Sequence, residues 1–349
     1  MQQLEQLNFT GQTSAFIAPI NCVARRDETP DATTFIFEAC NQAVFNFIPG
    51  QFITLQLEID GHEYARSYSM SSSPSRPFTL ECTVKRVEGG VVSNWLIDHL
   101  QPDMSLNALA PAGEFSLKNS QQPARYLLLS AGSGITPVMS MARWLLDTNS
   151  TAQIDFVHSS PNRDNTIFQK RLEMLDEIYD NFNLNQLFSR PANADDAQRF
   201  SAEWLNQNIT DLEDTEVYVC GPTGYMKGVE AALEARGFNM DRFFKESFQP
   251  ETPTENTAMN AAATFALDVE GQKTIEIKAG QSILDAVEKA GLDMAAACRA
   301  GVCGACKCQI TEGEAESSSQ ANLSDEDIEQ GYALACSTTV SSDSRVKLS

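Results

Sequence analysis

Short runs of hydrophobic residues, separated by turns, fill the first third of the chain. The runs that predict strands cover residues 21–29, 32–39, 51–59, 78–87 and 105–111. Turn-forming pairs such as Pro49-Gly50 stand between them, and one helical pattern, at about residues 92–99, interrupts them. Regular short strands with few helices predict a barrel or a sandwich, and we expect an antiparallel β-barrel over residues 18–118. The polar residues 1–17 predict an N-terminal arm.

At about residue 119 the pattern changes to alternating strands and helices. The predicted strands cover 126–130, 154–160, 184–190 and 216–222, and the predicted helices cover 138–146, 166–182, 201–209 and 223–237. The all-apolar run 126–130 is typical of a strand in a buried parallel sheet. We therefore expect a doubly wound α/β domain over residues 119–250, whose ligands bind at the carboxyl ends of the strands.

The last part of the chain is again rich in strand patterns. Residues 251–263 contain Pro, Thr, Asn and Ala without any period and predict a linker. The domain predicted over 264–349 has strands at 264–270, 273–279 and 307–313, and an acidic helix near 323–331. Its main helix, 282–291, begins at Ser282 with Asp285 three residues later, which predicts a capping box. The pattern predicts a small α+β domain.

Charge and composition exclude several classes of function. The net charge of −22 argues against nucleic acid or an anionic membrane as the partner. No apolar run approaches the roughly 18 residues of a membrane span, and the polar first 20 residues do not fit a signal peptide. With nine cysteines in the chain, we expect a protein of the reducing cytoplasm.

Four cysteines near the end of the chain have the spacing of a plant-type [2Fe–2S] ligand set. They are Cys298, Cys303, Cys306 and Cys336, in the pattern C-x4-C-x2-C followed by a distant fourth cysteine. Small residues between them allow backbone N–H groups to approach the sulfurs. A zinc site usually pairs two C-x2-C knuckles, and only one is present. We expect a [2Fe–2S] cluster, with zinc or free thiols as the alternatives.

Three further motifs have the chemistry of anion sites. Gly89-Gly90 opens the helix at about 92–99, and a helix N-terminus preceded by glycines binds anions. Arg66 supplies a guanidinium suited to a phosphate, and Tyr68 a ring suited to stacking. The third motif, the glycine turn 131–137, lies between a strand and a helix as in dinucleotide-binding folds, although Pro137 replaces the usual third glycine. Each of these motifs alone also fits an ordinary strand or turn.

Taken in order, the motifs RSYS, GGVVS, GSGITP, CGP and FKESF and the four cysteines resemble one family. It is the ferredoxin–NADP reductase superfamily, in the form with a C-terminal ferredoxin domain. The resemblance covers the chain from about residue 18. It implies an FAD-binding β-barrel, an NAD(P)-binding α/β domain and a β-grasp ferredoxin domain.

The resemblance also implies roles for the matching residues. Those implied to bind flavin are Arg66, Ser67, Tyr68, Ser69, Gly90, Val91, Val92 and Ser93, with Tyr68 against the isoalloxazine and Arg66 on the pyrophosphate. Those implied to bind the nicotinamide dinucleotide are Gly132, Gly134, Thr136, Pro137, Cys220, Gly221 and Pro222. Phe248 and Glu246 are implied to lie near the flavin, and Thr136, Cys220 and Glu246 are the candidates for a catalytic role.

The implied activity is electron transfer from NADH through FAD and the [2Fe–2S] cluster to an acceptor protein. Ser189 and Arg190 have the chemistry to bind a ribose 2′-phosphate, so NADPH stays open as the coenzyme. The stretches EGGVVSNWL and ACRAGVCGACK look most like the branch that reduces hybrid-cluster proteins. Reductase components of Rieske-type oxygenases are also similar. A flavin and iron–sulfur redox sensor without turnover is the alternative from another class.

Overall fold

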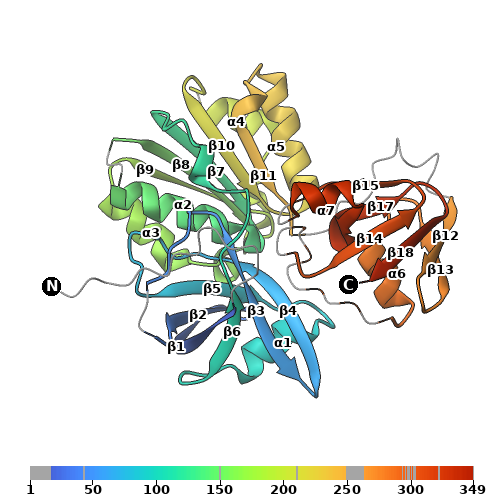
Figure 1. Cartoon of the computed structure of the whole chain (residues 1–349). Helices are drawn as coiled ribbons and strands as arrows, with labels where there is room; N and C mark the ends of the chain where they lie inside the picture. Colours follow the sequence, from blue (N-terminus) through green and yellow to red (C-terminus); the bar gives the residue numbers. More distant parts are fainter. Residues whose placement is uncertain are drawn as a thin grey trace.

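The computed structural model describes most of the chain. Its described residues are 17–41, 44–148, 151–209, 211–248, 263–292, 294, 296, 299, 301, 304–320 and 323–348. The predicted arm (1–17) and linker (251–263) lie outside the described residues, except for one residue of each, Ile17 and Ala263. Three units follow one another along the chain (Figure 1).

The first unit is an antiparallel β-barrel, as predicted. Its strands are β1 (Ile17–Thr29), β2 (Ala32–Ala39), β3 (Phe52–Ile59), β4 (His62–Ser69), β5 (Leu80–Lys85) and β6 (Ser105–Leu109). They form a six-stranded sheet in the order β4-β3-β6-β1-β2-β5, and a bridge between Met70 and Cys82 joins its two edges. Helix α1 (Val91–His99) packs Val92 and Leu96 into the core cluster that holds Phe35, and the barrel is thereby closed at that end.

The second unit is a parallel α/β sheet. Its strands are β7 (Arg125–Ala131), β8 (Gln153–Ser160), β9 (Phe182–Phe188), β10 (Thr215–Cys220) and β11 (Phe243–Glu246), in the order β11-β10-β7-β8-β9. Helices α2 (Ile135–Thr148) and α3 (Gln169–Ile178) pack on one face, in the cluster with Leu128 and Phe156. On the other face, α5 (Thr223–Ala235) and α4 (Ala202–Asn208) pack with Leu129 and Val157. The strand order reverses between β7 and β10, where a doubly wound sheet binds its ligand.

Two sequence expectations for this unit need correction. The helix predicted over 166–182 covers only Gln169–Ile178, because Phe168 has a left-handed backbone (φ 63°) and Phe182 already begins β9. Strand β11 was not expected, because a strand of four residues at a sheet edge, of which only Phe243 and Phe244 are hydrophobic, shows no measurable period.

The third unit is the α+β domain expected at the end of the chain. Its elements are β12 (Thr264–Val269), β13 (Thr274–Lys278), α6 (Ile283–Lys289), β14 (Lys307–Glu312), β15 (Ala315–Ser317), α7 (Asp325–Glu329), β16 (Tyr332–Leu334), β17 (Thr338–Val340) and β18 (Ser344–Leu348). Five of the strands form a sheet in the order β13-β12-β18-β14-β16, and β15 pairs with β17. Ser282 caps α6 as predicted, accepting a bond from the Asp285 N–H, whereas the reciprocal capping box is found at Ser324 and Asp327 of α7.

Short one-turn 3₁₀ helices connect several of these elements. They are η1 (Leu117–Asn119), η2 (Gly132–Gly134), η3 (Arg163–Asn165), η4 (Ala194–Asp196), η5 (Met240–Arg242) and η6 (Ala335–Ser337). Among the described residues, no helix has both the length and the apolar content needed to cross a bilayer.

The second unit sits directly on the barrel. The Ser140 hydroxyl of α2 donates to the Ser72 carbonyl oxygen (2.6 Å), and the Arg143 guanidinium donates to the Ser71 carbonyl oxygen (2.8 Å). The third unit lies to one side, next to β4 and α5 in the view of Figure 1. Ala305 of this third unit packs against Ala65 of β4 and Leu109 of β6.

Candidate functional site

The predicted flavin motif lies on β4, an edge strand of the barrel sheet. Tyr68 packs against the barrel core, and burial raises the pKa of its hydroxyl above the usual range. Ser69 is buried, and the Ser67 hydroxyl shares a hydrogen bond of 2.9 Å with that of Thr54. The guanidinium of Arg66 lies over the ring of Tyr64, 5.9 Å from its centroid. Arg66 and Tyr68 therefore stand two residues apart on the same face of one strand.

Arg66 is a half-buried cation without a carboxylate partner among the described residues. Its Nη1 donates to the carbonyl oxygen of Ala65 (2.8 Å), and no ion pair involves it. Burial, and then the charge of Arg299, lower its pKa. The more distant charge of Glu288 acts in the opposite direction. Since a partly buried guanidinium without a direct ion pair is costly, this arrangement fits a guanidinium that binds an anionic group.

The second flavin motif forms the N-terminus of α1. No side chain caps this helix, so its first N–H groups are available to an anion. The Ser93 hydroxyl accepts a bond from the Val87 N–H (3.2 Å), and the Asn94 amide donates to the Gly90 carbonyl oxygen (2.6 Å), so the turn is held from two sides. A Cβ on Gly90 would stand 2.8 Å from the Ser93 oxygen. The helix terminus and its glycine fit a phosphate group.

The predicted dinucleotide loop connects β7 to α2. Gly132 has a φ of +56°, and the loop forms the turn η2 before α2 begins at Ile135. A Cβ on Gly134 would lie 2.2 Å from the Cys220 carbonyl oxygen, so only glycine allows the loop to touch the end of β10. Thr136 is buried and donates to the Ser133 carbonyl oxygen (3.0 Å), and Pro137 stands in the first turn of α2. The loop therefore lies at the switch point of the sheet.

Cys220 and Glu246 end two neighbouring strands beside this loop. They are register partners of β10 and β11, and Cys220 is also the partner of Ser130 at the end of β7. Burial raises the pKa of Glu246 to about 8, and one of its carboxyl oxygens has no hydrogen-bond partner. Burial, and then the charge of Glu246, raise the pKa of the Cys220 thiol well above its usual value. At neutral pH both side chains are therefore uncharged.

The chain continues from Cys220 and Glu246 in two different ways. Gly221 packs closely against Ala131, because a Cβ on Gly221 would lie 3.0 Å from the Ala131 Cβ. Pro222 is the residue before α5. Phe248 follows Glu246 and is 49% exposed. Exposure of so large an apolar ring leaves it able to cover a bound ring system.

Ser189 and Arg190 lie away from that centre, after the edge strand β9. The Ser189 N–H donates to the Ser160 carbonyl oxygen (3.0 Å) and the Arg190 N–H to the Pro161 carbonyl oxygen (2.7 Å). The pair therefore borders the carboxyl end of β8. Arg190 is exposed, and no ion pair of the described residues includes it.

The cluster ligands are described only in part. Cys298 and Cys303 lie outside the described residues. Cys306 is buried, its carbonyl oxygen accepts the Ala335 N–H (2.9 Å), and Cys336 is the next residue. The Gly301 N–H donates to the Cys336 sulfur (3.2 Å), and the φ of +70° at Gly301 makes this approach possible. Two thiols at adjacent points and a backbone donor to sulfur fit an iron–sulfur cluster.

The contact of Ala305 with Ala65 brings the cluster loop to the flavin motif. Ala305 precedes Cys306, and Ala65 precedes Arg66. Residues that are separated by about two thirds of the chain thus meet at one surface. Cys308, two residues after Cys306, belongs to the core, where burial raises the pKa of its thiol to about 12.

The motifs did not reveal a buried carboxylate at the boundary of the first two units. Glu81 of β5 forms ion pairs with Arg171 (2.8 Å), Arg143 (3.3 Å) and Arg26 (3.3 Å). Arg143 belongs to α2 and Arg171 to α3, so one carboxylate connects the barrel to both helices. No sequence signal marks this group, because its members are far apart in the chain and have no fixed spacing.

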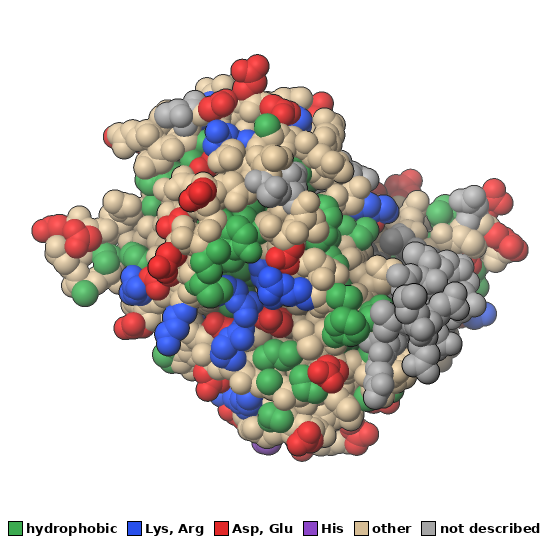
Figure 2. Space-filling model, turned by 90° about the vertical axis from the view of Figure 1, so that its left-hand side faces the viewer, with side chains coloured by type: hydrophobic (Ala, Val, Ile, Leu, Met, Phe, Trp, Pro, Cys, Tyr) green, Lys and Arg blue, Asp and Glu red, His purple; other side chains and the backbone are tan. Residues whose placement is uncertain are grey.

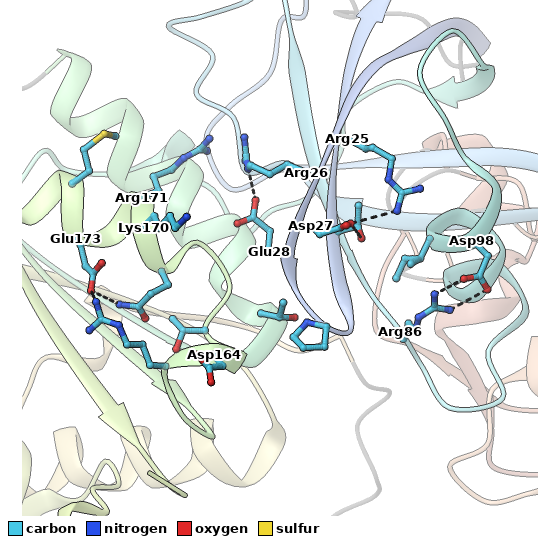
Figure 3. Close-up of a pocket in the computed structure, with 18 of the residues that line it drawn as sticks. Arg25, Arg26, Asp27, Glu28, Arg86, Asp98, Asp164, Lys170, Arg171 and Glu173 are labelled. Carbon is cyan, nitrogen blue, oxygen red and sulfur yellow. Dashed lines mark hydrogen bonds and ion pairs between the residues drawn. The ribbon is translucent and has the colours of Figure 1, made fainter. Parts of the chain in front are cut away.

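A second feature that the motifs did not reveal is a large cavity. It has a volume of about 1350 Å³ and lies between the β1–β2 hairpin, α1 and α3 (Figure 3). Lys and Arg side chains gather around it in the middle of the face shown in Figure 2. Most of these cations are paired, as Arg26 is with Glu28 (2.8 Å) and Arg86 with Asp98. None of the predicted site residues lines this cavity.

Comparison with known proteins identifies the three units. Residues 19–117 match the oxidoreductase FAD-binding domain, residues 128–231 the oxidoreductase NAD-binding domain, and residues 267–341 the 2Fe-2S iron-sulfur cluster binding domain. The first match covers the barrel, the second covers β7 to α5, and the third includes Cys298, Cys303, Cys306 and Cys336. These matches confirm the cofactors expected from the sequence: FAD, NAD(H) and a [2Fe–2S] cluster.

Relatives match the chain over almost its whole length. The glycine betaine monooxygenase reductase subunit of Pseudomonas aeruginosa is 38% identical over 343 residues, which cover 93% of each chain. The stachydrine N-demethylase reductase subunit of Rhizobium meliloti is 34% identical and covers 96% of this chain and 97% of its own. The solved structure of phthalate dioxygenase reductase shares the fold, with a TM-score of 0.64 at 21% identity, over 95% of this chain and 97% of its own.

By name these proteins are the reductases of a monooxygenase, an N-demethylase and a dioxygenase. They give no support to the expected closeness to reductases of hybrid-cluster proteins. The fold and the electron-transfer class expected from the sequence are confirmed. The chain is an oxidoreductase that passes electrons from NAD(P)H through FAD to a [2Fe–2S] cluster. It belongs to the ferredoxin–NADP reductase superfamily of flavoproteins that carry a C-terminal [2Fe–2S] ferredoxin domain.

Proposed function

We propose that this chain is the reductase component of an oxygenase that acts on N-methylated ammonium carboxylates. The observation that carries the proposal is the match to the glycine betaine and stachydrine reductase subunits over more than nine tenths of all the chains compared. Glycine betaine and stachydrine both contain a quaternary ammonium group and a carboxylate. An oxygenase component, as a separate protein, would receive the electrons and bind that substrate.

The geometry of the site supports an electron path toward such a partner. FAD, when bound, accepts two electrons as hydride from the nicotinamide and releases them singly to the cluster. On our proposal, Arg66 and the N-terminus of α1 hold the flavin phosphates, and Tyr68 covers one face of the flavin ring. The contact of Ala305 with Ala65 then keeps the cluster loop next to β4. The third unit is acidic overall, so we expect the oxygenase component to dock through a basic surface.

The residues beside the nicotinamide loop position groups and handle protons. On our proposal, Gly134 and Gly221 let the nicotinamide approach the ends of β7 and β10, and Thr136 holds the turn. The neutral thiol of Cys220 acts as a small apolar contact, because its raised pKa excludes a thiolate at neutral pH. Glu246, protonated below about pH 8, can donate a proton at this end of the sheet.

The test is reconstitution with a purified oxygenase component that demethylates glycine betaine or stachydrine. We expect NADH consumption that requires the substrate and releases formaldehyde in equal amount, because each demethylation uses one NADH and one O₂. The variant C306S serves as the matched control: it removes one predicted cluster ligand and should keep NADH–ferricyanide activity while losing formaldehyde release. If the oxygenase stays inactive while a hybrid-cluster protein is reduced anaerobically, the proposal is wrong. If no acceptor is reduced, a redox-sensor role replaces it.

We propose NADH as the preferred coenzyme, and Arg190 provides the test. A guanidinium that binds a 2′-phosphate would make NADPH the better substrate. In our proposal Arg190 does not do so, and R190E should change kcat/KM for NADH and NADPH by the same factor. A selective loss of NADPH activity in R190E would show that Arg190 binds the 2′-phosphate.

A further inference from the structure

Three consecutive serines, residues 317–319, lie beside a predicted cluster ligand in the third, cluster-bearing unit. The first of them ends β15, which pairs with β17 over three residues of each strand. The pairing extends one residue further, because the Ser318 N–H donates to the Ser337 carbonyl oxygen (2.8 Å). Ser337 directly follows the predicted ligand Cys336. Backbone hydrogen bonds therefore fix the serine segment, residues 317–319, next to this cysteine.

The side chains of the serine segment alternate between the inside and the outside of the unit, as in a strand. Ser317 and Ser319 are half-buried, whereas Ser318 is exposed. The Ser317 hydroxyl shares a hydrogen bond of 2.7 Å with that of Thr338 and so joins β15 to β17. The Ser319 hydroxyl reaches beyond the sheet and donates to the carbonyl oxygen of Gly301 (2.6 Å). Ser319 thus connects the fixed segment to the loop that carries the predicted cluster ligands.

Gly301 is bonded to the serine segment on one side and to the cysteine on the other. Its carbonyl oxygen accepts from Ser319, and its N–H donates to the sulfur of Cys336 (3.2 Å). Gly301 is buried, and a Cβ on it would lie 2.8 Å from the Cβ atoms of both Ser319 and Ser337. Both serines therefore pack directly on this glycine. Its orientation is set by one hydroxyl, one sulfur and two side chains that enclose its Cα.

A hydrogen bond to a ligand sulfur changes how readily the cluster on that sulfur is reduced. Reduction adds one electron, and hence one negative charge, to the cluster and its ligands, and it breaks no bond. An N–H that donates to the sulfur stabilises the more negative form more strongly, so it raises the reduction potential. The strength of the bond depends on how well the N–H is aimed at the sulfur. Groups behind the donor control that aim.

We propose that Ser319 is a positioning residue that raises the reduction potential of the cluster through Gly301. The Ser319 hydroxyl holds the Gly301 carbonyl oxygen, and the N–H of Gly301 is thereby directed at the Cys336 sulfur. Ser337 supports the arrangement, because its hydroxyl has the carbonyl oxygens of Ser319 (3.3 Å) and Leu334 (3.2 Å) as acceptors. A higher potential makes the cluster a better acceptor for electrons from the flavin.

The test measures the cluster potential in the full-length protein that contains its flavin and its cluster. A dithionite titration with redox mediators is followed by the electron paramagnetic resonance signal of the reduced cluster. In S319A the Gly301 carbonyl oxygen loses this donor, and the aim of the N–H is relaxed. We expect the equilibrium constant for reduction to fall about tenfold, the effect of about one hydrogen bond, which lowers the one-electron potential by about 59 mV.

The variant S318A is the matched control. It removes the hydroxyl of the neighbouring, exposed serine, which donates to the Ser337 carbonyl oxygen (3.1 Å). That oxygen keeps the Ser318 N–H as a donor, so the potential should stay close to that of the unchanged protein. Equal potentials in S319A and S318A would overturn the proposal, and so would a higher potential in S319A.

Visible absorbance of the cluster is recorded for every variant, because a potential can be measured only where the cluster assembles. If S319A assembles no cluster, S337A takes its place, since it removes the second serine side chain that packs on Gly301. A lower potential in S337A than in S318A is then the expected result. The same potential in both would refute the proposal.

A second readout uses the coenzyme in place of dithionite. NADH and NAD⁺ are mixed anaerobically in the ratio that half-reduces the cluster of the unchanged protein. At this ratio a tenfold smaller equilibrium constant leaves about one tenth of the S319A clusters reduced, and half-reduction in S319A would contradict the lower potential. Neither measurement involves an oxygenase component, so failure of this proposal and failure of the proposed function can be told apart.

Discussion

The carboxylate of Glu81 offers the sharpest test of how the barrel and the nucleotide-binding unit are held together. Its side chain is 11% exposed, as is that of Arg143, and that of Arg171 is 20% exposed. The change E81Q keeps the size of the side chain and removes its charge. Arg143 and Arg171 are then left as largely buried cations that face a neutral amide.

The expected loss of folding free energy in E81Q can be estimated from these ion pairs. Removing one partner of a buried ion pair costs about 3–5 kcal/mol. The pair with Arg26 adds little, because that side chain is 42% exposed and its charge is screened by solvent. We take the lower end of the range, about 3 kcal/mol, because the other two arginines are not fully buried. This loss corresponds to a roughly hundredfold change in the equilibrium between docked and separated units.

The assay is urea unfolding, followed by flavin fluorescence at pH 7. The surface pair of Arg86 and Asp98 supplies the control, because both side chains are at least one third exposed, and D98N should change stability by less than about 1 kcal/mol. Adding R143M to E81Q should recover part of the loss, since it removes the uncompensated cation. If E81Q and D98N unfold alike, or if R143M adds to the damage, our account of Glu81 is wrong.

The dependence of this effect on pH follows from the pKa of Glu81. Burial alone would raise it, but the charges of Arg143 and Arg171 outweigh burial and lower it below its ordinary value of 4.5. A carboxyl with a lowered pKa contributes its stability above the unfolded-state pKa and loses it as the pH falls through the folded-state pKa. The difference between the unchanged protein and E81Q should therefore be constant near pH 7 and shrink below about pH 4.5.

Three further predictions concern the candidate site. Because burial raises the pKa of Glu246 from 4.5 to about 8, the folded state holds a proton that the unfolded state releases, so the unfolding free energy should fall as the pH rises from about 4.5 to 8 and level off above, in the unchanged protein but not in E246Q. G134A puts a Cβ where the Cys220 carbonyl oxygen lies, 2.2 Å away; flavin reduction by NADH should be lost while reduction by dithionite persists, and normal NADH kinetics would contradict the close packing. C306S should lose the visible absorbance of the cluster and C308A should keep it, whereas the reverse result would make Cys308 a ligand.

The regular parts of the fold could be predicted because their patterns are local. The run 126–130 is apolar throughout and lies within β7, and the strand 216–222 and the helix 223–237 correspond to β10 and α5. Strands β15, β16 and β17 have three residues each, too few to show a period. Helix α3 is shorter than its hydrophobic pattern predicts, because the backbone at Phe168 is left-handed. A phenylalanine in the sequence gives no sign of such a conformation.

In the candidate site too, the features that are local in the sequence could be predicted and the others could not. Glycine turns and cysteine spacings are contiguous motifs, and they could be recognised without knowing the fold. The ion pairs of Glu81 join residues that are far apart in the chain. Such pairings depend on how the units are placed, and a single sequence contains no periodic signal for them. The roles assigned to the motif residues stay predictions until the variants above are measured.

The position of β18 has a consequence for proteolysis and aggregation of the cluster-bearing unit. Strand β18 (Ser344–Leu348) lies between β12 and β14 in the middle of its sheet. A protease that removed residues 344–348 would split the sheet and expose two bare strand edges, and unpaired edges recruit other strands. The nicked protein would keep its flavin barrel and still oxidise NADH, while its iron–sulfur end became a seed for aggregation. A few residues thus separate an intact reductase from one that consumes coenzyme without delivering electrons.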